Sequence, residues 1–460
     1  MGGLFGAFSQ TSVAERIKQE KESILEDVYL GLFALQHRGQ QSAGIAWAAD
    51  DDRIQSIKTV GLLGGIDISR LDGINSNSAI GQVRVSNKSE SSLQNAQPLT
   101  IKYSRGHVAV AHDGILSNTE ELTLKLEKDG SIFQSECDTE LLLHLMAHQP
   151  DKCPIDALLS SLPLLKGGFG MLLLLEDKMV ALRDPFGFKP LVLGSRDNTI
   201  YAASETCALD IIGATFMREV EPGEAVVISR DKIESVRFAP QLANSSICSF
   251  EYVYIARPDS VIEGRYVYAA RKELGRILAR MDKSFSAFTD LVTGMPDSGT
   301  IAALGYAEAS GLPYDIAVSI NRYVGRTFIR PTLRIRELGV KLKLNPSARL
   351  LAGKNVVIVD DSIVRGTTSK KAVSVIRESG PKEIHMRIAS PPVRYPCHYG
   401  IDTRSADTLI ASRMDIKSLC SHIGADSLEY VNENDLINAI GLPSCKMCTA
   451  CFSGEYPHNS

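Results

Sequence analysis

The sequence lacks any run of about 18 apolar residues, so no stretch of it predicts a membrane-spanning helix. It begins without the basic and then apolar segments typical of a secretory signal, and Gly6 stands where a myristoylation motif needs serine or threonine. Positive charge is not in excess, because the formal net charge is −4. This excludes a general attraction to nucleic acid or anionic membranes. We expect a cytoplasmic protein with neither kind of partner.

Cysteines are also few and scattered, with nine in 460 residues, which excludes a disulfide-stapled secreted fold. Three of them lie near the C-terminus as Cys445-Lys-Met-Cys448-Thr-Ala-Cys451, a spacing that favours thiolate ligation of iron or zinc. The isolated ones are interpreted as small buried apolar residues, namely Cys137, Cys153, Cys207 and Cys420. The hydrophobic content of 44% is ample for two or three soluble globular domains.

The first half of the chain predicts a domain that mixes helices and strands. Short apolar runs bounded by turn residues predict strands at 108–111, 171–175 and 224–228. Apolar residues at helical spacing predict one long helix over 14–34 and a second over 119–128, which Asn118 would cap. Residues 235–247 predict a connector, so we expect domains at 1–240 and 241–460.

The second half alternates strand, loop and helix, which is typical of a parallel α/β sheet. A buried strand over 355–359 leads into the loop Asp360–Ser369 and then into a helix, after which another strand is predicted at 384–389. The helix would carry Ala372, Val375 and Ile376 on its buried face. Backbone N–H groups and hydroxyls at a helix N-terminus surround an anion well, so this loop fits a 5′-phosphate.

Two adjacent carboxylates, Asp360 and Asp361, open this loop and suit the two hydroxyls of a ribose ring. The alternative is a pair that faces solvent or binds Mg²⁺ directly. A second strand, loop and helix lies earlier, with the strand at 291–295 and the helix ending near Ser310. Between the two loops, seven basic residues stand against the single acid Glu337 over 322–343. This segment predicts a flap over a leaving diphosphate, and a solvated basic face is the alternative.

These motifs, together with the segments 248–260, 395–402 and 448–457, resemble the iron–sulfur branch of the glutamine phosphoribosylpyrophosphate amidotransferases over nearly the whole chain. The resemblance to these amidophosphoribosyltransferases implies an α+β glutaminase domain of the N-terminal-nucleophile type, with four layers αββα. An α/β type I phosphoribosyltransferase domain with a parallel sheet would follow. It also implies a homo-oligomer that purine nucleotides inhibit.

The resemblance implies a set of ligand-binding residues in the second half. The phosphoribosylpyrophosphate site would comprise Asp297, Ser298, Gly299, Thr300, Arg322, Asp360, Asp361, Ser362, Arg365, Gly366, Thr367, Thr368 and Ser369. Ser298, Asp360 and Asp361 would hold Mg²⁺. The cysteines at 248, 397, 448 and 451 (Cys248, Cys397, Cys448 and Cys451) would ligate a [4Fe–4S] cluster, which leaves Cys445 surplus. Ile320 stands where the family commonly has a lysine.

The first half follows the family's glutaminase scaffold at 35–44, 97–98, 112–118 and 183–190, but its chemical positions differ. Arg84 and Asp138 stand where the family contacts the α-carboxylate and α-amino groups of glutamine, and Gly114 is retained. Gly2 replaces the nucleophilic cysteine, and Asp113 replaces the asparagine whose amide stabilises the oxyanion. The segment 81–89 departs from the family pattern as well, with Gln82 in place of histidine.

We therefore expect a silent glutaminase domain joined to a working transferase. The transferase would make 5-phosphoribosylamine and diphosphate for purine synthesis, with ammonia from solution or from a partner protein. The alternative is a non-catalytic regulatory paralogue that binds phosphoribosylpyrophosphate or purine nucleotides. An engineered cysteine-to-glycine knockout is a further alternative, and it would leave Asp113 and the altered segment 81–89 unexplained.

Overall fold

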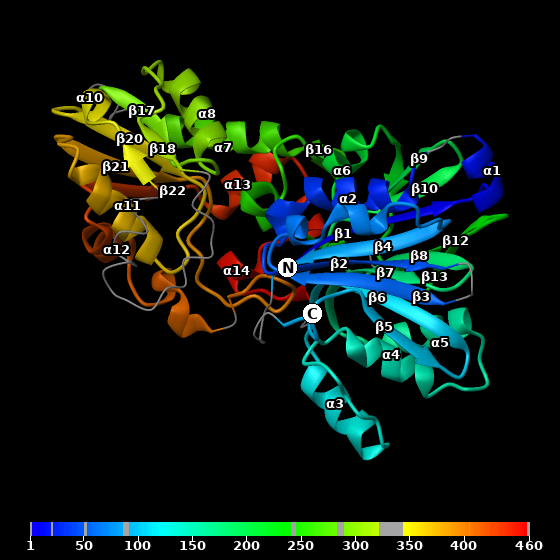
Figure 1. The fold of residues 1–460 in the computed structure, drawn as a ribbon. Coiled ribbons are helices and arrows are strands. Elements are labelled where there is room, and N and C mark those ends of the chain that lie inside the picture. The colour runs from blue at the N-terminus through cyan, green and yellow to red at the C-terminus, as the bar shows by residue number, and fades with distance from the viewer. Residues whose placement is uncertain are drawn as a thin grey trace. The chain divides into compact units, whose positions relative to one another are not determined.

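The computed structural model describes residues 2–19, 22–49, 53–85, 92–240, 245–282, 289–321, 344–403 and 405–457. The chain divides into two compact units (Figure 1). The first unit comprises Met1–Cys248, Ser260–Gly264 and Cys397–Asp402, and the second comprises Ser249–Asp259, Arg265–Pro396 and Thr403–Ser460. None of the helices formed by the described residues is long and apolar enough to span a membrane.

Two antiparallel sheets form the centre of the first unit. The seven-stranded sheet has the order β11-β9-β10-β1-β4-β2-β3, and the six-stranded sheet has the order β13-β12-β8-β7-β6-β5. The strands of the seven-stranded sheet are β1 (Gly2–Ser9), β2 (Ser42–Ala48), β3 (Ile54–Val60), β4 (Ser78–Arg84), β9 (Val192–Arg196), β10 (Thr199–Ala203) and β11 (Thr215–Glu219). The strands of the six-stranded sheet are β5 (Leu99–Tyr103), β6 (Gly106–Leu116), β7 (Gly167–Leu174), β8 (Lys178–Arg183), β12 (Glu224–Ser229) and β13 (Ile233–Arg237).

The buried side chains of the first unit show four layers. One core fills the space between the two sheets and includes Leu4, Ile80 and Leu172. A second core packs α2 (Ile24–Ala34) and α6 (Thr206–Ile211) on the seven-stranded sheet. A third packs α4 (Glu140–Ala147) and α5 (Pro154–Ser161) on the outer face of the six-stranded sheet (Figure 1). The expected αββα arrangement and the three predicted strands are confirmed.

Three local predictions for this unit are wrong. The single helix over 14–34 is two helices, α1 (Val13–Lys18) and α2, because residues 18–23 contain no apolar side chain that could pack on the sheet. Helix α3 (Thr119–Lys128) has the predicted bounds, but Asn118 does not cap it. Its side chain instead donates to Leu164 O and accepts from Lys166 N. Residues 235–237 belong to β13 and not to a connector.

The second unit contains a parallel four-stranded sheet with the order β17-β20-β21-β22. Its strands are β17 (Leu291–Gly294), β20 (Asn355–Asp360), β21 (Glu383–Ile388) and β22 (Ser427–Tyr430). The helices around it are α7 (Val267–Met281), α8 (Thr300–Ser310), α11 (Thr367–Arg377) and α12 (Ile416–Ile423). The expected parallel α/β sheet is confirmed.

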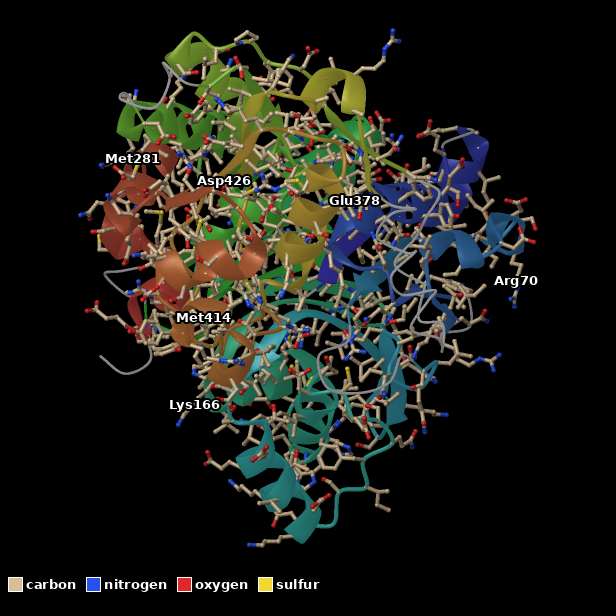
Figure 2. The ribbon with its side chains drawn as sticks, turned by 90° about the vertical axis from the view of Figure 1, so that its left-hand side faces the viewer. Arg70, Lys166, Met281, Glu378, Met414 and Asp426 are labelled. Carbon is tan, nitrogen blue, oxygen red and sulfur yellow. The ribbon has the colours of Figure 1, made fainter. Side chains whose placement is uncertain are left out.

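The helix after β20 buries a slightly different face from the predicted one. Ala372, Val373 and Ile376 are buried in the core, whereas Val375 is half-buried. At the far end of this helix, Arg377 pairs with Asp426, whose side chain is labelled in Figure 2, at 2.8 Å. Asp426 also accepts the backbone N–H of Ile384, so it ties the end of α11 to the start of β21. These contacts fix the helix whose N-terminus faces the predicted phosphate loop.

Candidate functional site

The two predicted ligand loops of the second unit begin side by side. β17 and β20 are parallel neighbours, and Gly294 lies opposite Val359, so both loops leave the same edge of the sheet. The N–H of Met295 donates to Val359 O at 2.8 Å. A Cβ atom on Gly299 would lie 2.2 Å from Val359 O and 3.0 Å from Asp360 Cα. Only glycine allows this approach, which brings the segment Asp297–Thr300 against the acidic pair.

The acidic pair carries unfavourable charge. Asp361 is 7% exposed and donates its N–H to Asp360 Oδ1 at 2.9 Å. Ser362 Oγ donates to Asp361 Oδ2 at 2.5 Å. Burial, and after it the charge of Asp361, raises the pKa of Asp360 well above its usual value. Hydroxyl donors or a cation between the two carboxylates would relieve this repulsion, so the arrangement suits a ribose diol.

The phosphate loop ends at the N-terminus of α11. Gly366 precedes the helix with φ 73°, a left-handed conformation that side chains disfavour, and a Cβ there would lie 2.4 Å from Ile410 Cδ1. Thr367 and Thr368 are exposed in the first turn, whereas Ser369 is buried. The first N–H groups of a helix have no partner within the helix, and they attract an anion. The loop thus presents hydroxyls and N–H groups together, and exposed Arg365 adds a positive charge.

The side chains that the two loops bring together show whether this site fits Mg²⁺. Within the described part of the chain, no group of three or more His, Cys, Asp or Glu side chains could hold a metal ion. Asp360, Asp361 and Ser298 instead offer two carboxylates and a hydroxyl on neighbouring loops. Proteins commonly bind Mg²⁺ through one or two carboxylates plus the phosphates of the substrate. The donors therefore fit an ion that enters with the substrate.

The predicted basic flap falls outside the described residues. Arg322 and the rest of the segment 322–343 belong to that part of the chain. Ile320, the residue at the family's lysine position, is described and ends strand β18 (Val318–Ile320). It lies opposite Leu344 of β19 (Leu344–Pro346). An apolar side chain therefore ends the strand from which the segment leaves.

In the first unit, the space next to Gly2 is occupied by Gln82. A Cβ atom on Gly2 would lie 3.0 Å from Gln82 Nε2 and 3.0 Å from Val83 O. Such contacts are tighter than side chains normally make, so a side chain at this position would require Gln82 to shift by a few tenths of an ångström. Gln82 is 1% exposed, and its Nε2 donates to His112 O. The amide of Gln82 is thus held next to the position from which a side chain at residue 2 would extend.

Asp113 is the centre of a buried ionic network beside Gly2. The N–H of Gly2 donates to Asp113 Oδ1 at 2.7 Å, and Arg38 Nη2 donates to Oδ2 at 3.1 Å. Lys189 Nζ lies 3.9 Å from Oδ1. Burial favours a higher pKa for Asp113, but Lys189, Arg38 and the positive amino terminus outweigh it and lower the pKa to about 2. The carboxyl group is therefore ionised at neutral pH.

Arg38 extends this network to a second buried acid. Its Nε donates to Gly2 O at 2.8 Å, and its Nη1 donates to Glu205 Oε1 at 2.7 Å. Glu205 also contacts His37 Nε2 at 2.7 Å and accepts from Ser260 Oγ at 2.7 Å. Burial favours a higher pKa for Glu205, but His37 and Arg38 outweigh it and lower the pKa. The charges around Gly2 thus satisfy one another.

The two residues predicted to hold glutamine's α-groups are placed near each other. Arg84 lies opposite Gly2 in the sheet and donates to Asn95 O at 3.0 Å. Asp138 accepts the N–H of Leu116 at 3.0 Å. Burial favours a higher pKa for Asp138, but His112, the Leu116 N–H and Arg84 outweigh it and lower the pKa to about 2.

Gly114, the retained glycine of this site, has φ 144°, and a Cβ atom there would lie 1.9 Å from Gly168 O.

Sequence reasoning did not assign a role to Arg38, Lys189 or Glu205. Arg38 and Lys189 lie in segments that the resemblance marked only as scaffold. Glu205 is the only charged residue between Tyr201 and Leu209, and such an isolated charge in an uncharged run is a signal of a buried ion pair. Gln82 was noted as a departure, but its proximity to Gly2 required the register of β1 and β4.

The four cysteines predicted to ligate a cluster form no disulfide and are divided between the units. Cys248 and Cys397 belong to the first unit, and Cys448 and Cys451 belong to the second. Cys397 Sγ accepts the N–H groups of Tyr399 and Ile401, both at 3.4 Å. Cys448 and Cys451 are 9% and 8% exposed. Ligating thiolates commonly accept such N–H groups. The four cysteines are not gathered into a group that could hold a metal ion among the described residues, so the [4Fe–4S] cluster stays a prediction.

Comparison with known proteins gives concordant results. A protein-family model described as a glutamine amidotransferase domain matches residues 83–210. The amidophosphoribosyltransferase of Bacillus subtilis is 44% identical over 435 residues, which cover 93% of this chain and 90% of that protein. That of Methanocaldococcus jannaschii is 41% identical over 474 residues, which cover 99% of this chain and 98% of that protein.

A solved structure agrees with these relatives in fold. The glutamine phosphoribosylpyrophosphate amidotransferase from B. subtilis, complexed with ADP and GMP, superimposes with a TM-score of 0.89. Its sequence is 42% identical, and the match covers 99% of this chain and 97% of that chain. The match thus includes both units of this chain. This chain therefore belongs to the amidophosphoribosyltransferases, the glycosyltransferase-type enzymes of purine biosynthesis.

Proposed function

We propose that this protein forms 5-phosphoribosylamine and diphosphate from phosphoribosylpyrophosphate and ammonia, and that its glutaminase site is silent. The observation that carries the proposal is the absence of a side chain at Gly2 together with the crowding there, where Gln82 Nε2 lies 3.0 Å from the position of a Cβ atom. By contrast, the two ligand loops of the second unit keep their hydroxyls, carboxylates and close backbone approach. The transferase half is therefore the working half.

The second unit supplies binding and orientation. Asp360 and Asp361 accept hydrogen bonds from the ribose hydroxyls, and the N-terminus of α11 holds the 5′-phosphate. The segment Asp297–Thr300 lies against the acidic pair and contacts the diphosphate. Mg²⁺, when bound, neutralises charge that develops on the leaving diphosphate.

The group transfer needs no protein nucleophile. The lone pair of ammonia forms the bond to C1 of the ribose, and the C1–oxygen bond breaks with its electrons going to the diphosphate. The attacking nitrogen then loses a proton to water. Neutral ammonia is already a nucleophile, so the protein contributes mainly by holding C1 and the leaving group in line.

The first unit cannot perform the corresponding chemistry on glutamine. Gly2 has no side chain to form a γ-glutamyl thioester. Loss of one oxyanion donor costs about 2.7–4 kcal/mol of transition-state stabilisation. Asp113, ionised because its pKa is about 2, adds repulsion at that place. Ammonia must therefore come from solution or from a partner protein.

Regulation and assembly follow the family in this proposal. The B. subtilis relative was solved with ADP and GMP bound. We extend this to the present chain and expect purine nucleotides to inhibit it and the chain to form a homo-oligomer. Inhibition of ammonium-dependent turnover by GMP, measured at several concentrations of phosphoribosylpyrophosphate, tests the first expectation. Light scattering of the purified protein tests the second.

A [4Fe–4S] cluster on Cys248, Cys397, Cys448 and Cys451 is part of the proposal. Its support is the thiol chemistry of these residues and the N–H groups that Cys397 Sγ accepts. Anaerobically purified protein should contain about four iron and four sulfide ions per chain and absorb in the visible range. Cys448→Ser should lose both signals, whereas Cys153→Ser, at an exposed thiol, should keep them. Zinc in place of iron would overturn the assignment.

The decisive assay measures diphosphate release from phosphoribosylpyrophosphate with Mg²⁺, with ammonium or glutamine as the nitrogen source. Release with ammonium alone supports the proposal. Release with glutamine would contradict the silent glutaminase and require another nucleophile. Absence of release with both, in cluster-loaded protein, would favour the regulatory paralogue.

A further inference from the structure

The segment Ser260–Gly264 belongs to the first unit although the chain on both sides of it belongs to the second. Glu263 in this segment has φ 48°, a left-handed conformation that residues with side chains disfavour. The N–H of Glu263 donates to Glu219 Oε1 at 2.5 Å, and Arg183 Nη2 donates to Glu263 Oε1 at 2.8 Å. These contacts of Glu263 hold a backbone that would otherwise relax.

Two further hydrogen bonds hold the start of the segment. Ser260 Oγ donates to Glu205 Oε2 at 2.7 Å, and the N–H of Val261 donates to Thr206 Oγ1 at 2.9 Å. The pKa of Glu205 is lowered, mainly by His37 and Arg38 against burial, so this acid stays ionised at neutral pH. The start of the segment is therefore held by groups that do not titrate near neutrality.

At residue 263, by contrast, three carboxyl groups surround one buried guanidinium. Arg183 Nη2 lies 2.8 Å from Glu263, and its Nη1 lies 3.7 Å from Glu219. Asp184 follows Arg183 in the chain and is fully buried. One positive charge cannot balance three negative charges, and burial of the excess charge favours uptake of a proton.

The hydrogen bonds indicate which acid takes this proton. Asp184 accepts the N–H groups of Phe169, Phe186, Gly187 and Phe188, which favour its charged form. Burial nevertheless raises the pKa of Asp184 to about 6. Burial, and after it the charge of Glu263, raises the pKa of Glu219 to about 7, against the influence of Arg183. Glu219 is therefore the acid that holds a proton to the highest pH.

We propose that a proton shared by Glu219 and Glu263 holds residue 263 against the first unit, and that the turn loosens as the pH rises toward neutrality. In the held state, ionised Glu263 pairs with Arg183. Protonated Glu219 donates its O–H to the Glu263 carboxylate and accepts the Glu263 N–H. When the proton passes to water, this hydrogen bond becomes a repulsion between two carboxylates.

The other charged groups nearby come from β11, the loop after it and the residues after the turn. Arg218 of β11 donates to both carboxylate oxygens of Glu224, at 2.8 and 2.7 Å. Glu221 is exposed on the loop after β11, and Arg265 is exposed two residues after Glu263. Exposed charges interact weakly in water, so Arg183 is the cation that most influences the Glu219–Glu263 pair.

Hydrogen exchange of the full-length protein measures the loosening directly. Exchange of the peptide 260–266 is followed by mass spectrometry from about pH 4.5 to 8 and corrected for the intrinsic pH dependence of exposed amides. Because opening releases one proton, the open fraction should rise by up to about tenfold per pH unit and level off above about pH 7. The peptide over β12 should keep its protection and is the internal reference.

Glu219→Gln is the decisive variant. Glutamine keeps the carbonyl that accepts the Glu263 N–H and a donor toward the Glu263 carboxylate, but it has no proton to lose in this range. Protection of the peptide should therefore be high at every pH. Glu221→Gln removes an exposed acid from the same region and should keep the wild-type pH dependence. Glu263→Gln is a second neutral variant that should also remove the pH dependence.

Thermal unfolding gives an independent readout. Because the folded pKa of Glu219 is raised, its contribution to stability is complete below its ordinary pKa of 4.5 and is lost as pH rises through about 7. The melting temperature of Glu219→Gln relative to wild type should therefore be higher at about pH 8 than at about pH 4.5, whereas Glu221→Gln should show no such change.

The inference does not depend on the proposed function, since its tests use neither substrate nor turnover. A wild-type turn whose corrected protection is the same at every pH would overturn it. So would a pH dependence that survives in both Glu219→Gln and Glu263→Gln.

Discussion

The two sites of this protein differ in whether their charges are satisfied without a ligand. In the first unit, the Asp113 carboxylate meets Gly2 N, Arg38 and Lys189, and its pKa is lowered to about 2. In the second unit, Asp360 faces Asp361, and its pKa is raised well above the usual value. A site that binds ligand retains unfavourable electrostatics that the ligand relieves, whereas a site that has lost its chemistry can pair its charges internally. The comparison therefore supports the proposal that the working site lies in the second unit.

The largest expected effect is on the acidic pair. Asp360→Asn and Asp361→Asn should each lower kcat/KM for ammonium-dependent diphosphate release by about 10–100-fold, because each removes a charge-assisted hydrogen bond of about 1.5–3 kcal/mol. Asp360→Asn should also raise the melting temperature at neutral pH. Its carboxyl has a raised folded pKa, so its stabilising contribution exists only at acidic pH and is lost as pH rises.

Glu378→Gln is the matched control for this prediction. Glu378 is an exposed acid just after α11, and its side chain is labelled in Figure 2. Its replacement removes one charge from the same unit and should change neither kcat/KM nor the melting temperature. A fall in both activity and melting temperature for Asp360→Asn would show that the pair has a structural role instead.

Restoring the first site should require several changes at once. Gly2→Cys alone should remain without glutamine-dependent release, because Gln82 crowds the new side chain and ionised Asp113 repels a developing oxyanion. Gly2→Cys combined with Gln82→His and Asp113→Asn should release glutamate from glutamine. Glutamate production is measured for each single, double and triple variant. Activity in the single variant would show that Gly2 is the only defect.

Asp113 should make a measurable contribution to acid stability. Because its folded pKa is lowered from 3.8 to about 2, its contribution is complete above about pH 4 and is lost as pH falls toward 2. The shift corresponds to about 2 kcal/mol at neutral pH. Urea unfolding of wild type and Asp113→Asn between pH 2 and 7 measures it. A difference that is equal at all pH values would indicate lost packing rather than a lost ion pair.

The smallest expected effect is at Ile320. If the family's lysine contacts the diphosphate, Ile320→Lys should lower KM for phosphoribosylpyrophosphate by about fivefold, which corresponds to about 1 kcal/mol for one partly exposed cation. The value of kcat should change little. Ser319→Lys, at an exposed position on the same strand, is the control. Equal effects of the two lysines would point to general charge attraction.

Local patterns predicted the second unit better than the pocket of the first. The apolar strand 355–359 and the loop after it are contiguous in sequence, so the placement of Asp360, Gly366 and Thr367 between a strand and a helix was predicted without any tertiary information. The approach of Gly299 to Asp360 required only that two parallel strands be neighbours.

The first pocket is built from segments distant in sequence, which no periodicity relates. Gly2 of β1 and Asp113 of β6 belong to the two different sheets. Arg38, Lys189 and Glu205 lie outside the strands and join them only in the folded chain. The break in the helix predicted over 14–34 was missed because helical spacing was extended through a polar stretch. Asn118 was predicted as a cap from residue type, but its side chain found backbone partners in another segment.

The most direct test of the comparison follows the nitrogen itself. The protein is supplied with phosphoribosylpyrophosphate, Mg²⁺, isotopically labelled glutamine and unlabelled ammonium, and the product 5-phosphoribosylamine is trapped and weighed by mass spectrometry. The account predicts that the product carries only unlabelled nitrogen and that the glutamine stays intact. Labelled nitrogen in the product would contradict it, because the site around Gly2 would then still release ammonia.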